Sequence, residues 1–165
     1  MIEKPCPECG FDTSSFEREH VGQMIRDNAA AWRAVLERGD VVRQRPRDDC
    51  WSALEYACHV RDVLDLYLVR LGLMLDEDDP QYPNWDQDAT AIEKRYDADD
   101  PAGVVRDLEA AADRLADRFD TVSGDQWDRP GTRSDGARFT IETFARYFIH
   151  DPIHHLHDVG AGGER

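Results

Sequence analysis

Histidines gather near the C-terminal end of the chain, in a spacing that suits metal binding. Four of the six histidines lie within eight residues: His150, His154, His155 and His157. At about 100° per helical residue, His150 and His154 stack one turn apart, His157 lies within about 20° of His150, and His155 points away. Two imidazoles spaced i,i+4 can converge on one ion at about 2.0–2.1 Å. We expect His155 and His157 to orient ligands or to lie at the surface.

A third ligand has to come from a facing helix, and His59 is the candidate. It lies in an apolar helical pattern, with Glu55 at i−4 and Asp62 at i+3. A buried imidazole beside carboxylates is unfavourable unless it is paired or ligated. We therefore predict a metal site formed by His59, His150 and His154. Glu55 and Asp62 are the predicted catalytic carboxylates, which either orient His59 or act as bases, with orientation favoured.

Three neutral imidazoles leave one open position on a tetrahedral zinc ion, and that position allows two chemistries. The ion can favour ionisation of a low-molecular-weight thiol that attacks an electrophilic carbon, or it can activate water for hydrolysis. Arg61 and Arg146 are close in sequence to the proposed ligands, and we predict that they bind carboxylates of the thiol cofactor or substrate. A non-enzymatic interaction module, with His157 as fourth ligand, is the alternative. A solvent-connected cavity at the metal would discriminate between the two.

The N-terminal cysteines form a second motif. Cys6 and Cys9, in the sequence Cys-Pro-Glu-Cys-Gly, are half of a zinc-ribbon signature. Cys50 and Cys58 cannot supply the other half together, because eight helical residues separate them by about 12 Å of rise. The pair could recruit His20 or the cysteines of a second copy. The favoured interpretation is a reduced dithiol on a mobile terminal segment.

Helical periodicity recurs along the chain, and no alternating strand pattern persists. A capping-box pattern begins at Ser52, Asp100 and Pro101 open a later helix, and Pro152 predicts a kink in the last one. The connection between the second and third long helices is long enough for a crossover. We predict an all-α four-helix bundle, with a short extra helix near 89–96 and long helices near 15–37, 52–75, 101–119 and from 140 onward.

Composition limits the function further. The chain has 165 residues, which is one domain at roughly 100–200 residues per domain. We divide it into an N-terminal extension (1–14), the bundle (15–159) and a disordered tail (160–165). With 35 acidic and 20 basic residues the net charge is −15, which argues against nucleic-acid and anionic-membrane binding. No apolar stretch reaches about 18 residues and the N-terminus lacks signal-peptide features, so we expect a cytoplasmic protein.

Two segments resemble a known family. Residues 51–63 (WSALEYACHVRDV) and 150–155 (HDPIHH) are similar to the two signature segments of the DinB-like superfamily, which includes mycothiol-dependent maleylpyruvate isomerases and bacillithiol transferases. The resemblance spans roughly residues 16–159. It implies an up-down-down-up bundle, often a homodimer, that holds a divalent metal, Zn²⁺ or Ni²⁺, with His59, His150 and His154. The implied activity is transfer of a mycothiol-type thiol to a small electrophile, or isomerisation of that electrophile. Metal-dependent hydrolysis is the alternative.

Overall fold

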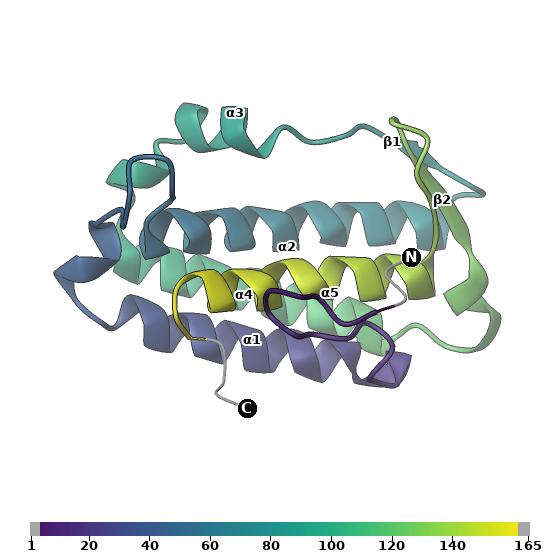
Figure 1. The fold of residues 1–165 in the computed structure, drawn as a ribbon. Coiled ribbons are helices and arrows are strands. Elements are labelled where there is room, and N and C mark those ends of the chain that lie inside the picture. The colour runs from purple at the N-terminus through teal and green to yellow at the C-terminus, as the bar shows by residue number, and fades with distance from the viewer. Residues whose placement is uncertain (1–3, 162–165) are drawn as a thin grey trace.

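Four long helices form the body of the protein, and the computed structural model describes residues 4–161. The helices are α1 (Val21–Leu36), α2 (Ala53–Asp76), α4 (Pro101–Asp120) and α5 (Ile141–Asp158). In Figure 1, α1 and α5 run in one direction and α2 and α4 in the other. The connection from α2 to α4 returns the chain to the end at which α2 began, so the predicted up-down-down-up bundle is confirmed.

Local sequence signals set the helix ends. The Ser52 hydroxyl accepts a hydrogen bond from the Glu55 amide (3.2 Å) and the Glu55 carboxylate accepts one from the Ser52 amide (3.1 Å), which is the predicted capping box. Asp100 caps α4, and α5 continues through Pro152. At the end of α5, Ala161 donates to the Leu156 carbonyl, so residues 160–161 close the helix. The rest of the predicted tail, 162–165, lies outside the described residues.

The connections carry a small sheet that the sequence did not predict. β1 (Gln81–Tyr82) pairs in parallel with β2 (Pro130–Arg133), which pairs antiparallel with β3 (Arg138–Thr140). Strands of two to four residues are too short to show alternation, so the prediction of no strands was wrong for this physical reason. The connection from α2 to α4 also holds α3 (Gln87–Glu93) and the short 3₁₀ helix η3 (Tyr96–Ala98), and the connection from α4 to α5 holds η4 (Gly124–Asp128). A further 3₁₀ helix, η2 (Asp40–Arg43), lies between α1 and α2.

The core lies between the four helices, and α2 contributes more buried residues to it than any other helix. Aromatic side chains from three helices fill it, among them Trp32, Phe119, Phe144 and Phe148. α2 also buries polar side chains: Glu55, His59, Asp62 and Arg70. A buried polar side chain needs a hydrogen-bond or ionic partner, so α2 contacts polar groups as well as apolar ones at these four positions. Within residues 4–161, every helix is too short or too polar to cross a membrane.

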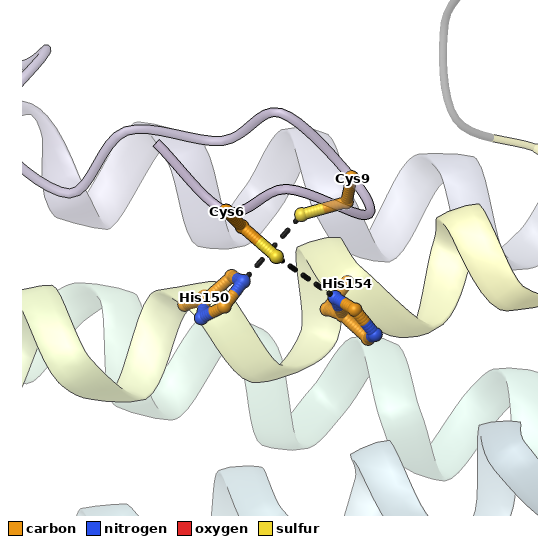
Figure 2. Close-up of side chains that lie close together, drawn as sticks. All are labelled: Cys6, Cys9, His150 and His154. Carbon is orange, nitrogen blue, oxygen red and sulfur yellow. Dashed lines mark hydrogen bonds between the residues drawn. The ribbon is translucent and has the colours of Figure 1, made fainter. Parts of the chain in front are cut away.

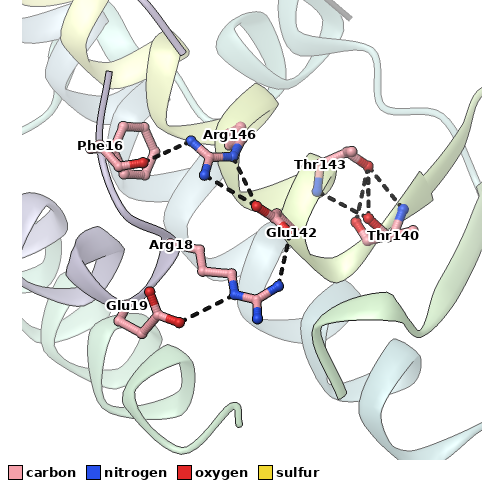
Figure 3. Close-up of polar contacts among 7 residues, drawn as sticks. All are labelled: Phe16, Arg18, Glu19, Thr140, Glu142, Thr143 and Arg146. Carbon is pink, nitrogen blue, oxygen red and sulfur yellow. Dashed lines mark hydrogen bonds and ion pairs between the residues drawn. The ribbon is translucent and has the colours of Figure 1, made fainter. Parts of the chain in front are cut away.

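The segment that precedes η1, from residue 4 onward, lies along α5 instead of extending from the bundle (Figure 1). α1 begins at Val21, later than predicted, because residues 18–20 form a separate 3₁₀ turn, η1 (Arg18–His20). Arg146 of α5 donates to the carbonyl of Thr13 (2.7 Å). It also donates to the carbonyl of Phe16 (2.9 Å), and Arg18 pairs with Glu142 (2.9 Å) (Figure 3). We call residues 4–20 the N-terminal strap.

Candidate metal centre

Helices α2 and α5 bring together His59, Asp151 and His155. His59 Nε2 lies 3.2 Å from one Asp151 oxygen, and His155 Nε2 lies 3.4 Å from the other. One potential ligand atom from each residue falls within 4.8 Å of the other two. Donors around an ion at about 2.0–2.2 Å are about 3.0–3.4 Å apart, so this spacing suits a shared cation.

Neighbouring side chains fix the orientation of both imidazoles. The ring of His59 stacks on Trp85 (5.5 Å, 10°) and also contacts Trp51 (5.5 Å). The Nδ1 atom of His59 is buried and has no hydrogen-bond partner among residues 4–161. His155 Nδ1 lies 2.8 Å from Asp158, which leaves its Nε2 facing Asp151. An outer carboxylate on the second ring nitrogen is usual for a metal-binding histidine.

The electrostatics of the group favour an ionised carboxylate. Burial raises the pKa of Asp151, but hydrogen bonds from His155 and His59 outweigh it and hold the pKa below its usual range. Burial lowers the pKa of His155, but the hydrogen bonds and charges of Asp151 and Asp158 raise it by a larger amount, so the net shift is upward. Asp151 is therefore held in the anionic form that binds a cation, and a metal ion bound here would displace the proton that the carboxylates favour on His155.

A pocket of about 570 Å³ opens onto this group. Its lining combines the metal-type donors with apolar and aromatic side chains from α2, α5 and the crossover, including Tyr67, Trp85 and Tyr147. The volume is in the range of small-molecule sites. The pocket is therefore the solvent-connected cavity that an enzyme requires and that a purely structural metal site lacks.

Arg70 and Arg133 also line the pocket. Arg70 is 4% exposed, donates to the Pro83 carbonyl (2.8 Å) and lies over the Tyr82 ring, but its Nε has no partner and no carboxylate pairs with it within residues 4–161. Burial lowers the pKa of Arg70. Arg133 pairs with Asp135 at the pocket edge (2.8 Å). A buried guanidinium with a free donor is suited to a bound anion.

His150 and His154 belong to a different cluster of potential ligands from the one that contains His59. They face Cys6 and Cys9 of the strap, with Cys6 Sγ 3.7 Å from His154 Nδ1 and Cys9 Sγ 3.4 Å from His150 Nε2 (Figure 2). Backbone amides of Cys9 and Glu8 donate to the Cys6 sulfur and lower the pKa of that thiol to about 6. The cysteines therefore lie against α5 histidines. The sequence analysis favoured a reduced dithiol on a mobile terminal segment, with His20 or a second copy as the alternative partner.

The predicted set of His59, His150 and His154 is accordingly divided. On α5 two i,i+4 pairs exist, and the rotation of the helix aims Asp151 and His155 at α2 while His150 and His154 face the strap. Rotation about the helix axis depends on tertiary packing, so the sequence spacing alone could not choose between the pairs. His155, which we expected to orient ligands or to lie at the surface, contacts Asp151 and packs against His59 (ring centroids 5.0 Å).

The two predicted catalytic carboxylates have other partners. Glu55 is buried in the capping box and in a two-bond ion pair with Arg45 (2.7 and 2.8 Å). Asp62 accepts from the Tyr96 hydroxyl and from Arg61 (3.1 Å). Neither lines the pocket, and the carboxylate that faces His59 is Asp151. The sequence signal for Asp151 was its i,i+4 relation to His155.

The two predicted cofactor-binding arginines also serve elsewhere. Arg61 pairs with Asp62 and Asp99 (3.0 Å) and lies over the Tyr96 ring. Arg146 holds the N-terminal strap and pairs with Glu142 (3.1 Å) (Figure 3). Arg70 and Arg133 occupy the pocket instead. The signal for Arg70 was an arginine in the middle of the apolar run 66–75.

Comparisons with known proteins agree with this architecture. The sequence model of the DinB superfamily matches residues 23–159. In structure the chain is similar to "YfiT from Bacillus subtilis", described as "a probable metal-dependent hydrolase with an unusual four-helix bundle topology", with a TM-score of 0.78 and 21% identity over 90% of this chain and 89% of that chain. A comparison with curated protein sequences gave no match. At this level of identity, the likeness to YfiT shows the fold.

Proposed function

Since this chain belongs to the DinB superfamily, we propose that it is a metal-dependent enzyme whose centre is formed by His59, Asp151 and His155. The observation that carries the proposal is the meeting of these three donors at the wall of a pocket of about 570 Å³. His157, which could have closed the coordination sphere, is exposed and belongs to neither donor group. The interaction-module alternative therefore has less support than an enzyme.

The chemistry follows from the donor set. A divalent ion bound there, Zn²⁺ or Ni²⁺, would supply Lewis acidity that favours the ionised form of a thiol or of water. The protein contributes three donors, so a coordination position is left for a small molecule from the pocket. Trp85 and Trp51 hold the His59 ring, and Asp158 holds the His155 ring. These contacts preorganise the donors before any ligand enters.

We propose that the reaction transfers a low-molecular-weight thiol of the mycothiol type to a small electrophile that carries an acidic group. The thiol S–H bond breaks and its proton leaves to solvent, while the sulfur forms a bond to the electrophilic carbon. A leaving group such as chloride departs with its electron pair, or, in an activated alkene, the π electrons pass to the neighbouring carbon, which takes up a proton. Arg70 and Arg133 bind the acidic group of the substrate or of the thiol. Trp85 and Tyr147 line the same pocket and reduce the access of water to it.

Hydrolysis is a second candidate, and one observation favours it. Two imidazoles and one carboxylate are the protein ligands of several hydrolytic zinc sites. YfiT, which shares the fold, is described as a probable metal-dependent hydrolase. In this case water takes the place of the thiol, and the two arginines bind an acidic ester or amide substrate.

The test uses the full-length protein loaded with Zn²⁺ or Ni²⁺. We would incubate it with a panel of thiols and with chlorodinitrobenzene-type or maleyl electrophiles, and would measure thiol consumption and metal content together. His155→Ala and Asp151→Asn should lower metal-dependent turnover at least about tenfold. His157→Ala, at an exposed position on the same helix, is the matched control and should retain it.

The same experiment separates the two reactions. Product formation from acidic esters or amides without added thiol would support hydrolysis and contradict thiol transfer. Turnover that is unchanged in both His155→Ala and Asp151→Asn would refute the assignment of this centre. The homodimer implied by the family resemblance stays a prediction.

A further inference from the structure

Two sulfur atoms and two ring nitrogens converge where the N-terminal strap crosses α5 (Figure 2). Cys6, Cys9, His150 and His154 each offer one ligand atom, and all four atoms lie within 4.8 Å of one another. Zinc binds sulfur at about 2.3 Å and nitrogen at about 2.0–2.1 Å, so sulfur and nitrogen on a tetrahedral ion are about 3.6 Å apart. The two sulfur–nitrogen distances, 3.7 and 3.4 Å, match that separation.

The outer contacts of the imidazoles fit metal ligation. His154 Nε2 lies 3.3 Å from Glu8 and 3.6 Å from Asp158, so the carboxylates favour a proton on Nε2 and leave Nδ1 toward Cys6. This is the arrangement in which a metal-binding histidine donates its other ring N–H to a carboxylate. Phe11 stacks on the ring of His150 (6.0 Å, 22°) and restricts its orientation.

The backbone around the cysteines is folded to present both sulfurs on one side. Gly10 donates to the Cys6 carbonyl (2.8 Å) and Cys6 donates to the Phe11 carbonyl (2.9 Å), which closes a tight loop. Gly10 has a φ of 74°, a conformation that glycine adopts at little cost. The loop directs both sulfurs at the histidines of α5 (Figure 2).

We infer that Cys6, Cys9, His150 and His154 bind a zinc ion in a second, structural site, separate from the His59 centre. Four protein donors of the Cys₂His₂ type complete a tetrahedron, so no position is left for a substrate. Two donors come from the strap and two from α5, so the ion would cross-link segments more than 140 residues apart in sequence. His150 and His154 also line the pocket, and the ion would therefore fix one of its walls.

The first test is metal content by elemental analysis of the full-length protein purified without chelator. We expect about two equivalents of metal per chain when both centres are filled, and about one equivalent in Cys6→Ser, Cys9→Ser and His154→Ala. Cys50→Ser is the matched control, because Cys50 is partly exposed and belongs to neither donor group, and it should keep the content of the parent protein.

The second test is cobalt substitution, which distinguishes the two centres by their ligands. Cobalt in a Cys₂His₂ site shows thiolate-to-cobalt charge-transfer absorption in the near ultraviolet and intense visible bands of tetrahedral geometry. The His59 centre contains no thiolate and cannot give the charge-transfer band. We expect Cys6→Ser and Cys9→Ser to weaken or remove the band, and His155→Ala to retain it.

A stability measurement tests the structural role. Loss of the bound ion should lower the thermal midpoint of Cys9→Ser by about 5–10 °C, and zinc should not restore it. Three results would overturn the inference: a charge-transfer band absent from the cobalt-loaded parent protein, a metal content unaffected by Cys6→Ser and Cys9→Ser, or a Cys6–Cys9 disulfide in protein purified under reducing conditions. None of these results bears on the His59 centre, whose failure would appear in His155→Ala instead.

Discussion

At the scale of single residues, Arg70 is a buried cation kept without a carboxylate partner among residues 4–161. Burial lowers its pKa, which shows that the protein interior disfavours its charge. An apolar side chain of similar length should fit the site better. We predict that Arg70→Met raises the free energy of unfolding by about 1 kcal/mol and abolishes protection by small dicarboxylates such as malonate.

Urea unfolding with and without malonate measures both effects of Arg70→Met. Arg114→Met, which removes an exposed arginine paired with Asp65, is the control and should change stability by less than about 0.5 kcal/mol. If Arg70→Met were less stable and still bound malonate, Arg70 would be a structural residue rather than an anion-binding one.

Asp62 gives a prediction about pH. Burial raises its pKa, but the hydrogen bond from Tyr96 and the ion pairs with Arg61 and Lys94 outweigh burial, so the pKa lies below the usual 3.8. A lowered pKa in the folded state stabilises the fold above the unfolded pKa, and this contribution is lost as the pH falls through the folded pKa. Asp62→Asn should therefore lower the free energy of unfolding by about 2–3 kcal/mol at pH 7, and by progressively less below about pH 4.

Denaturant titrations at pH 7 and at about pH 3 measure this difference. Asp107→Asn, on an exposed face of α4, is the control and should have a small effect at both values. A cost for Asp62→Asn that is the same at both pH values would contradict the assignment. Retained turnover in Asp62→Asn at neutral pH would agree with a structural role, in contrast to the catalytic role predicted from sequence.

The residue types of the site were predictable from the sequence, but their grouping was not. The cluster of histidines on the last helix, the buried His59 and the Cys6–Cys9 motif were all recognised as potential ligands. Their division into two groups depends on how α5 is rotated against α2 and on where the strap crosses it. The first depends on packing between residues 92 apart in sequence and the second on packing between residues more than 140 apart, which a local pattern does not contain.

At the scale of elements, the N-terminal strap is attached to α5 by few side chains. Arg146 contributes two hydrogen bonds to strap carbonyls, a pair with Glu142 and a stacking contact over Phe16 (4.8 Å). We predict that Arg146→Met increases hydrogen exchange of residues 4–20 and leaves exchange in α2 and α4 unchanged. Arg138→Met, an exposed substitution outside the strap, is the control. Unchanged exchange in the strap would show that other contacts hold it.

The long helices were predictable because their end signals are local. The capping box at Ser52 and Glu55 and the cap at Asp100 appear in the structure as expected. The sheet was not predictable, since β1 and β2 pair across about fifty residues and each strand is at most four residues long. At Gly131 a Cβ atom would lie 2.8 Å from the Met74 side chain, so close packing of the sheet on α2 uses this glycine.

At the scale of the whole molecule, net charge should influence stability. With a net charge of −15, the excess carboxylates repel one another in the folded state, and dissolved salt screens that repulsion. We predict that the thermal midpoint rises when sodium chloride increases from roughly 50 to 500 mM at pH 7. The rise should disappear near pH 4.6, the sequence isoelectric point, which serves as the control. A midpoint that falls with salt at pH 7 would show that the ion pairs dominate over net repulsion.

Asp158 contacts one imidazole from each donor group. One of its oxygens lies 3.6 Å from His154 Nε2 and the other 2.8 Å from His155 Nδ1. We expect this shared carboxylate to link the two metal affinities. An ion bound by Cys6, Cys9, His150 and His154 would fix the position of Asp158 and strengthen binding at the His59 centre, and reciprocity would then require the same factor in the other direction. Calorimetric titrations of the two sites should then give coupled affinities in the parent protein and independent ones in Asp158→Asn. The readiness of the pocket for its metal would thus depend on residues at the opposite end of the chain.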